Sequence, residues 1–400
     1  MRRRLRAYCR TLFLTIGAMA ASVALLNWLV DPYDMYCHSV SGHFRSYKRR
    51  LIHRVSKAEI ARRGLYDVLL IGDSRIAAGY DADHPALTRF GSVYNLSVAA
   101  SSIYECSRML DLVFEKPGSK PGLIVWGISP EFVVRDRSPR TEFDFDASLL
   151  NPRLNYGEYH LRNLLTLDAT RHTLWTIRDR LMSQPDVIAS TQTSSGGFTS
   201  PAAASELVSH ETFVHVLPAR HSYLAEHEPM PAVAEAEQLL RNCFNRCRER
   251  GAELKIVIPP VHAVYLERLH QLGLGERIEF GKRTLVSLAT ECNSTTASAP
   301  PIEIWDFSSF RGPPTEAYAT TTTTAPMHWY QDALHFREAL GNLTLDQMFG
   351  MANEVPEFGT RLTESNVEVH LISQRTARNV YQRKHTDHVQ LAIEGPVTRR

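Results

Sequence analysis

The stretch VLLIGDSRIAAGYD, residues 68–81, decides how the rest of the chain is interpreted. Its apolar run 68–71 stops at the turn residues Gly72 and Asp73, as a buried parallel strand does. Small residues that favour a helix follow Ser74. Ligands of open α/β sheets bind beyond the carboxyl ends of the strands. The pattern therefore predicts that Ser74 lies at a functional edge.

Further apolar runs rich in valine and isoleucine repeat this pattern, at residues 92–98, 122–128, 253–260 and 302–308. Helical candidates lie between most of these runs, for instance at 104–115 and 232–251. Strands that alternate with helices predict an α/β fold. We expect a three-layer α/β/α, doubly wound, flavodoxin-like domain with a mostly parallel five-stranded sheet.

The composition limits the class of protein. The 400 residues are 44% hydrophobic and 22% charged, which is enough apolar material for a full α/β core. The 45 basic and 43 acidic residues are spread along the chain and give a formal net charge of +2. No overall field favours nucleic acid, so we expect no nucleic-acid partner.

The N-terminus predicts a membrane anchor. Residues 11–30 form a charge-free stretch of twenty residues with one interior amide, Asn27, and arginines dominate residues 1–10. At about 1.5 Å per residue, twenty residues cross a hydrocarbon core of roughly 30 Å. The arginines favour the cytoplasm. We therefore expect a single-pass protein of the inner (cytoplasmic) membrane, with everything after residue 30 on the periplasmic side.

Three alternatives to this topology stay open. The motif Ala18-Met19-Ala20 is typical of a signal-peptidase site, but the apolar run continues through Leu29 and Val30, which favours an uncleaved anchor. A buried helix of a soluble protein is less favoured, because the stretch is not amphipathic. The third alternative is an inverted topology with the main domain in the cytoplasm.

The cysteines indicate no metal site. Cys9 would face the cytoplasm and the other five an oxidising space, which leaves at least one of the five unpaired. Cys243 and Cys247 are four residues apart in a predicted helix, without the partners of a zinc site. We interpret both as structural residues rather than metal or redox groups, and we expect neither a metal nor a cofactor.

Other segments divide the chain. Residues 31–65 form a membrane-proximal segment whose basic run, 47–54, is typical of a solvated helix face or a patch near a membrane. An insertion at about 130–230 contains a predicted helix at 158–182 and a serine- and threonine-rich loop at 183–205. This insertion forms either a lid or wall of the site, or a surface segment without a function. A second low-complexity loop covers 317–326, and the 351–400 tail, of unknown role, has a β-like stretch at 365–374.

Asp332 and His335 can supply what a serine nucleophile needs. A serine hydroxyl attacks poorly until a base takes its proton, and that base needs a third group to hold its tautomer. Their spacing places both side chains on one turn, just before a predicted helix at 336–349. The pair Asp81 and His84 has the same spacing, but it lies too close behind Ser74 to reach back, so we interpret it as a decoy.

The order and positions of the Gly-Asp-Ser motif and the Asp-x-x-His motif resemble those of the SGNH hydrolase superfamily, also called GDSL-type esterases. The likeness is greatest to its membrane-anchored bacterial members. The first block is IGDSR at 71–75, the second is YNLSVAASSIYE at 94–105, and the last is YQDALHFREALG at 330–341. DPYDMY (31–36) and IPPVHA (258–263) are also similar to that subgroup. The resemblance spans roughly residues 30–350 and implies an SGNH-like domain over 66–350.

This resemblance implies a role for several residues. Ser74 would be the nucleophile, His335 the base and Asp332 its orienting group. The Ser74 N–H, at the start of a helix, would contribute to the oxyanion hole.

Two departures concern the other oxyanion donors. Where such enzymes usually offer a glycine N–H, this chain has Ser97, Ala100 and Ser101 nearby, and it has Ser129 in place of the third block's asparagine. A lost oxyanion donor lowers the rate by a factor on the order of 10²–10³. Low activity or a different third donor therefore stays open.

Other candidates have a structural alternative each. Arg75 could hold an anionic substrate group or form a structural ion pair. His262 could contact substrate or be a hydrogen-bonded structural histidine. Asp306 is typical of a turn or cap. Trp126 and Trp305 are typical of core residues rather than a sugar-binding platform.

Two functions follow as hypotheses. The first is an anchored extracytoplasmic serine esterase or O-acyltransferase that acts on a small ester, such as an O-acetyl group of a cell-envelope glycan, through acyl-Ser74. The second is a non-catalytic SGNH-like envelope protein that binds glycan or a membrane acyltransferase partner; the missing asparagine favours it.

Overall fold

The chain folds as two compact units, one comprising residues 1–62 and 140–192 and the other residues 63–139 and 193–400. The computed structural model describes residues 2–44, 47–48, 54–64, 66–133, 145–182, 207–218, 231–295, 299–318, 325–352, 354–355 and 358–395. The predicted loop at 183–205, most of the basic run 47–54 and part of the loop at 317–326 lie outside these described residues.

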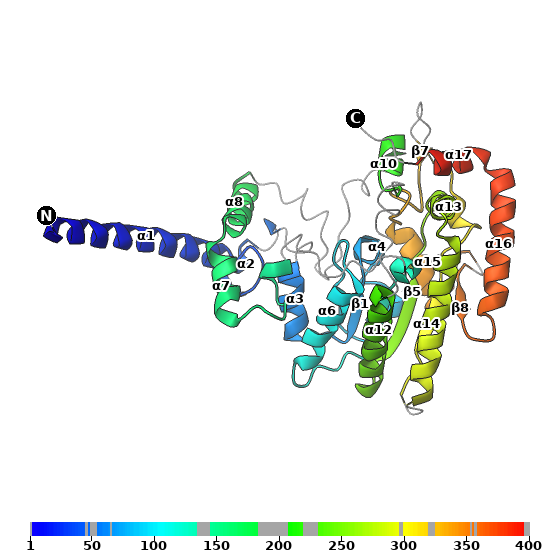
Figure 1. Cartoon of the computed structure of the whole chain (residues 1–400), viewed down its shortest axis with the longest axis horizontal. Coiled ribbons are helices and arrows are strands. Elements are labelled where there is room, and N and C mark those ends of the chain that lie inside the picture. The colour runs from blue at the N-terminus through cyan, green and yellow to red at the C-terminus, as the bar shows by residue number, and fades with distance from the viewer. Residues whose placement is uncertain are drawn as a thin grey trace. The chain divides into compact units, whose positions relative to one another are not determined.

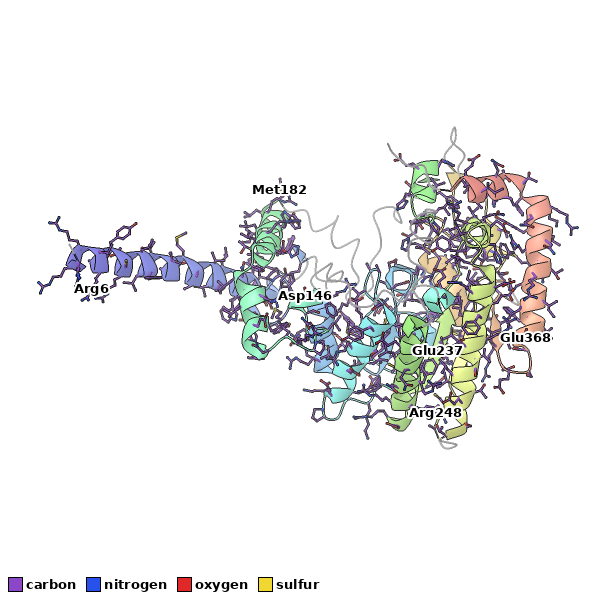
Figure 2. All side chains as sticks on the ribbon, in the orientation of Figure 1. Arg6, Asp146, Met182, Glu237, Arg248 and Glu368 are labelled. Atoms are coloured by element: carbon purple, nitrogen blue, oxygen red, sulfur yellow. The ribbon has the colours of Figure 1, made fainter. Side chains whose placement is uncertain are left out.

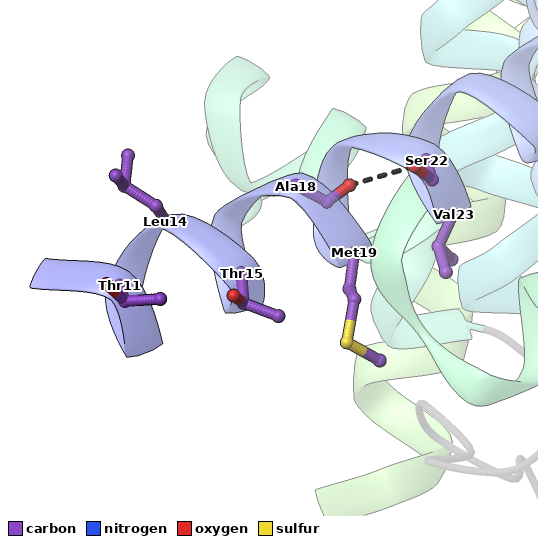
Figure 3. A pocket seen from close by; sticks show the side chains of 7 residues that line it. All are labelled: Thr11, Leu14, Thr15, Ala18, Met19, Ser22 and Val23. Atoms are coloured by element: carbon purple, nitrogen blue, oxygen red, sulfur yellow. Dashed lines mark hydrogen bonds between the residues drawn. The ribbon is translucent and has the colours of Figure 1, made fainter. Parts of the chain in front are cut away.

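The first unit begins with one long helix, α1 (Arg2–Val30), which includes both the arginine cluster and the apolar stretch (Figure 1). This helix is long and apolar enough to cross a membrane. Polar side chains within it are compatible with that environment, since the Ser22 hydroxyl donates 2.9 Å to the Ala18 carbonyl of its own helix (Figure 3). Ser22 and Ala18 line a hollow on the side of α1 together with five neighbours, from Thr11 to Val23.

The predicted helix at 158–182 is two helices, α7 (Tyr156–Leu165) and α8 (Leu167–Leu181). The break occurs at Thr166, whose backbone is extended and whose side chain accepts the Ala169 N–H at the start of α8. A threonine that caps a helix in this way favours a new start over continuation. Both helices pack on α1 (Figure 1).

Asp31 organises the chain where α1 ends. Its carboxylate accepts the backbone N–H groups of Met35, Tyr36 and Cys37 at 2.8–3.1 Å. Asp34 pairs instead with the buried Lys48 at 2.5 Å. Asp31, Asp34 and Cys37 are a group of possible metal ligands within 4.8 Å of one another, but both carboxylates already have protein partners, so we assign no metal there.

Short elements complete the first unit, namely α2 (Ser39–Gly42), α3 (Arg54–Arg63), which runs to the boundary, and a 3₁₀ turn, η4 (Phe145–Ala147). Its small core consists of buried side chains from four of its segments: Tyr33, Met35, Val55, Tyr159 and Ala169.

The second unit contains a six-stranded, mostly parallel sheet in the order β2-β1-β3-β5-β6-β8. The five expected strands are all present and parallel, as β1 (Val68–Ile71), β2 (Val93–Asn95), β3 (Leu123–Gly127), β5 (Glu253–Ile258) and β6 (Glu303–Asp306). The sixth, β8 (Thr360–Leu362), adds antiparallel to β6 and corrects the expectation of five strands. A separate ladder pairs β4 (Leu207–Val208) with β7 (Ala325–Pro326).

The strand order places Ser74 at a distinctive point. From β1 the chain goes first to β2 on one side and then to β3 on the other. Such a reversal beside β1 is the topological switch point, where α/β sheets of this order bind ligands. Ser74 opens α4 (Ser74–Gly79) directly after β1.

The helices of this unit begin and end close to the expected positions where the sequence showed a helical period. Those are α6 (Ile103–Glu115), α12 (Pro231–Glu249) and α15 (Glu338–Phe349). The others are α5 (Pro85–Thr88), α10 (His210–Val214), α13 (Ala263–Gln271), α14 (Gly275–Thr295), α16 (Val367–Lys384) and α17 (Thr386–Glu394), with 3₁₀ turns η3 (Pro130–Val133) and η6 (Pro313–Thr315). Helices α12 and α14 lie side by side (Figure 1).

The tail differs from the sequence prediction. The stretch 365–374 was expected to be β-like, but nearly all of it belongs to helix α16. A buried polar cluster explains its attachment to the sheet: His370 of α16 and Lys282 of α14 lie 2.8 Å and 2.7 Å from the Asp306 carboxylate. Asp306 also accepts the Ser308 N–H, so it is a turn residue as expected and an anchor for the tail as well.

The cysteines are all free thiols in this structure. Cys243 and Cys247 are buried in α12, and burial raises the pKa of both thiols to about 12. Thiols in such surroundings are unreactive, which agrees with the structural interpretation. Trp126 is buried in the core, as expected, whereas Trp305 is half-buried and donates its indole N–H to Glu303.

The crossing of α4 and α15 depends on glycine. A Cβ atom on Gly341 would lie 1.7 Å from the Gly79 carbonyl oxygen. Because this oxygen belongs to the backbone, it cannot move aside as a flexible side chain could. We expect Gly341→Ala to lower the free energy of unfolding by about 1–3 kcal/mol, although alanine has the higher helix propensity. The matched control is Gly122→Ala, whose Cβ would meet its nearest atom at 3.8 Å. Equal stability of both variants in urea denaturation would contradict this packing.

Buried histidines make the second unit sensitive to acid. Burial lowers the pKa of His262 to about 3, and that of His270 and His388 to about 4. The unfolded chain binds these protons near pH 6.5, so stability is full above about pH 6.5 and falls as the pH drops toward about 4. We expect a loss on the order of 1–2 kcal/mol per histidine between about pH 7 and about pH 5. A melting temperature that is constant over this range at fixed ionic strength would contradict the prediction.

Candidate active site

Ser74 is presented by a tight strand-to-helix turn. The preceding Asp73 caps α4, and its side chain accepts the Arg75 N–H at 2.9 Å. Gly72 has φ 155°, and a Cβ there would lie 2.6 Å from the Ile76 side chain. This turn leaves Ser74 half-buried at the end of β1. Within the described part of the chain, its backbone N–H has no hydrogen-bond acceptor.

Asp332 folds the loop that carries His335. One oxygen of the Asp332 carboxylate accepts the backbone N–H groups of Leu334 and His335, at 2.8 and 2.7 Å. The Gln331 N–H donates to the His335 carbonyl at 2.9 Å and closes the loop. The second Asp332 oxygen lies 2.8 Å from His335 Nδ1. The same carboxylate therefore shapes the loop and orients the imidazole.

The structure brings the three side chains into one hydrogen-bonded chain. Ser74 Oγ lies 2.8 Å from His335 Nε2, although 261 positions separate the two residues. The His335 side chain is 23% exposed and that of Asp332 is 9% exposed. A proton on Nδ1 donated to Asp332 leaves Nε2 free to accept the Ser74 proton, which is the protonation state that activates a serine. The serine and the imidazole are therefore partly exposed, while the carboxylate is largely shielded.

Arg75 forms an ion pair. Its guanidinium binds the Asp73 carboxylate, with Nη2 at 2.5 Å and Nε at 3.1 Å, and the side chain is buried. Burial alone would raise the pKa of Asp73, but the charge and hydrogen bonds of Arg75 outweigh it and lower that pKa. Nη1 lies 3.4 Å from the Ser129 hydroxyl. The structural alternative weighed for Arg75 is therefore the one that its contacts favour, and Ser129 belongs to the same cluster.

His262 is hydrogen-bonded to the loop that carries His335. It caps α13, its Nδ1 accepts the Val264 N–H, and its Nε2 lies 2.7 Å from the Glu316 carbonyl. Both ring nitrogens are thus engaged and the side chain is fully buried, which favours the structural interpretation over a substrate contact. The His262 backbone N–H donates to the Ala333 carbonyl at 3.1 Å, within the loop of His335.

The segment after β2 lies against the turn before Ser74. The Gly72 carbonyl accepts the Val98 N–H at 3.0 Å and the Ser101 hydroxyl at 2.7 Å. Ala100 has φ 53°, the left-handed conformation that glycine adopts most easily. Its backbone N–H has no acceptor among the residues that the structure describes, whereas Ser97 is buried and donates its N–H to Asn95. Ala100 is therefore a better candidate for an oxyanion donor than Ser97.

Glu316 is a positioning residue that sequence reasoning missed. Its carboxylate accepts the N–H groups of His328 at 2.5 Å and Trp329 at 3.0 Å, just before the loop that carries His335. Burial raises the pKa of this carboxyl group. No local pattern could reveal it, because the low-complexity segment separates Glu316 from the residues that it binds.

The decoy pair has other partners. His84 caps the short helix α5 and accepts the Ala86 N–H at 3.2 Å, and its Nε2 lies 3.5 Å from Asp346 of α15. The structure thus uses His84 in packing, away from the hydrogen-bonded chain of Ser74.

Comparison with known proteins adds no relative: no protein-family model, curated protein sequence or solved structure matches this chain.

The hydrogen-bonded chain predicts a reactive serine. We expect a fluorophosphonate probe to modify Ser74, as read by mass spectrometry of the labelled peptide. His335→Gln should slow labelling by several orders of magnitude, because the base is lost, and Asp332→Asn should slow it by favouring the wrong tautomer. His328→Gln, an exposed histidine of the same segment, is the matched control. Labelling that proceeds equally in His335→Gln and the control would rule out an activated Ser74.

Proposed function

We propose that this protein is a membrane-anchored serine esterase or O-acyltransferase of the SGNH type. The observation that carries the proposal is the chain from Ser74 through His335 to Asp332, with 2.8 Å at each step. The position of Ser74 after β1, at the switch point of the sheet, supports it. The three-layer, doubly wound arrangement typical of such enzymes is part of the proposal.

The geometry supports a two-step acyl transfer. His335 Nε2 takes the hydroxyl proton while Ser74 Oγ attacks the ester carbonyl carbon. The tetrahedral intermediate collapses, the C–O bond to the alcohol breaks, and the imidazolium returns the proton to the leaving alcohol. In the second step His335 removes a proton from water or a sugar hydroxyl, whose oxygen attacks the acyl-Ser74 carbonyl carbon. The bond from that carbon to Ser74 Oγ then breaks, and the imidazolium returns the proton to Oγ. Asp332 stabilises the imidazolium in both steps.

Two backbone N–H groups are the oxyanion donors we propose. Those of Ser74 and Ala100 have no acceptor among the described residues, and Gly72 connects their segments through its carbonyl. Preorganised backbone donors stabilise the negative charge that develops on the carbonyl oxygen. Ser129, which stands at the position of the family's asparagine, has its hydroxyl 3.4 Å from Nη1 of Arg75.

The substrate we propose is a small ester, such as an O-acetyl group on a cell-envelope glycan. The resemblance and α1 support this choice, because an anchor in the inner membrane would hold the domain near envelope polymers on the periplasmic side. Hydrolysis and transfer differ only in the acceptor of the second step.

A specific observation favours a second candidate function. Ser129 replaces the asparagine that usually contributes to the oxyanion hole, and its hydroxyl lies near the guanidinium of Arg75, itself bound to Asp73. A chain that has lost this donor could retain the sheet and serve as a non-catalytic protein that binds glycan or a membrane acyltransferase partner.

The two functions differ in acetate release. We expect the full-length protein to release acetate from an acetylated glycan or a small aryl acetate, and Ser74→Ala to lower the rate by a factor on the order of 10³ or more. Ser294→Ala, which removes an exposed hydroxyl at the end of α14, should retain the wild-type rate. Equal rates for Ser74→Ala and the control would reject the enzyme, and acetyl transfer to an added sugar would identify the transferase.

A further inference from the structure

Helix α8 has its apolar side chains on the outside. Leu167, Leu174 and Leu181 recur every seven residues, which places them on one face, and they are 88%, 54% and 79% exposed. The face turned inward is built from small and polar residues: Ala169, Thr173, Thr176 and Asp179. A helix of a water-soluble protein has the opposite distribution.

Helix α7 continues the exposed apolar surface. Leu161 and Leu165 are one turn apart, 59% and 41% exposed, and Tyr156 at the start of the helix is also exposed. Met182 directly follows α8 and is exposed as well (Figure 2). The arrangement in α8, with large apolar side chains outside and small residues at the helix contacts, is typical of helices in contact with lipid.

Asn27 connects this pair of helices to α1. Its side chain is fully buried, and Nδ2 donates to the Leu164 carbonyl at 2.8 Å and to the Thr170 hydroxyl at 3.1 Å. The single amide of the apolar stretch therefore binds the junction of α7 and α8. Hydrogen bonds of this kind hold helices together in membranes.

The position of Asn27 fixes the depth of that junction. Asn27 lies three residues before the end of α1 at Val30, so the junction is about 5 Å toward the membrane from the end of the helix. A hydrocarbon core of roughly 30 Å requires about twenty residues, the whole charge-free stretch 11–30. A span of that length places the junction about 5 Å inside the edge of the hydrocarbon core, within one helical turn of the headgroups.

The charges on α8 fit such a boundary. Arg171 and Arg178 share the face of the three leucines, and the Arg171 guanidinium lies 4.3 Å from the ring centre of Trp175. Tryptophan is enriched where apolar tails meet headgroups, and a long arginine side chain at this depth extends its charge to the headgroups. Arg178 also pairs with Asp179 at 2.6 Å.

We propose that α7 and α8 form a membrane-contact surface. Its exposed leucines, Leu161, Leu165, Leu167, Leu174 and Leu181, insert into the lipid leaflet at the C-terminal end of α1. This inference concerns how the protein is seated on the bilayer, and it does not depend on the chemistry of Ser74. The surface adds a second attachment to the single helix α1.

Site-directed spin labelling of the full-length chain in anionic lipid nanodiscs tests the proposal. In a Cys9→Ser, Cys37→Ser background, whose other cysteines are buried, nitroxides are placed at Leu174→Cys and Leu181→Cys. Phe13→Cys, on the exposed part of α1, gives the reference accessibility of a label in lipid. Val369→Cys is the matched control, because Val369 is an exposed apolar residue of helix α16 in the other unit.

The readout is the accessibility of each label to oxygen, which concentrates in lipid, relative to a water-soluble nickel complex. We expect the ratio at both α8 positions to approach that of Phe13→Cys and to exceed that of Val369→Cys severalfold. A ratio equal to that of Val369→Cys would overturn the proposal. Low accessibility to both reagents, with spin–spin broadening between copies, would also overturn it and would indicate that a second copy covers the leucines.

Discussion

The contact on which the site depends is the hydrogen bond between Ser74 and His335, which closes a loop of 261 positions. Local structure shapes each end of this contact but cannot bring the two ends together. It forms because α4 and α15 cross with Gly79 against Gly341, where the backbones approach too closely for any side chain. A small loss of fit at this crossing would act directly on the distance over which a proton must move.

An aspartate holds the backbone that presents each end of this contact. Asp73 caps the helix that presents the serine, and Asp332 binds the backbone of the loop that presents the histidine. Each carboxylate has a second partner, Arg75 in one case and the imidazole in the other. A carboxylate shielded from water requires such partners. Asp73 therefore fixes the Arg75 side chain, and Asp332 fixes the His335 imidazole. The proposed chemistry thus uses groups whose positions are already determined by folding.

The membrane-contact surface that we propose would expose the first unit to a different solvent from the sheet unit. In the sheet unit apolar side chains are turned inward, as in the strands of the parallel sheet, whereas in α8 leucines face outward and threonines inward. Full exposure of these leucines to water is unfavourable, and the lipid contact that we propose removes that cost, since lipid gives apolar side chains no reason to be buried. Asn27 fits the same interpretation, because its amide donates hydrogen bonds to α7 and α8 and so connects α1 to both helices.

By itself, the sequence determined the features that depend on neighbouring residues: the five parallel strands, the apolar helix of residues 11–30, and the Asp332–His335 pair, whose spacing is a property of one turn. Only tertiary structure decided the features that depend on distant partners. The stretch 365–374 alternates like a strand, yet it is helical because His370 reaches the buried Asp306. Hydrogen bonds and burial between remote segments outweigh weak local preferences, and a sequence pattern does not contain those distances.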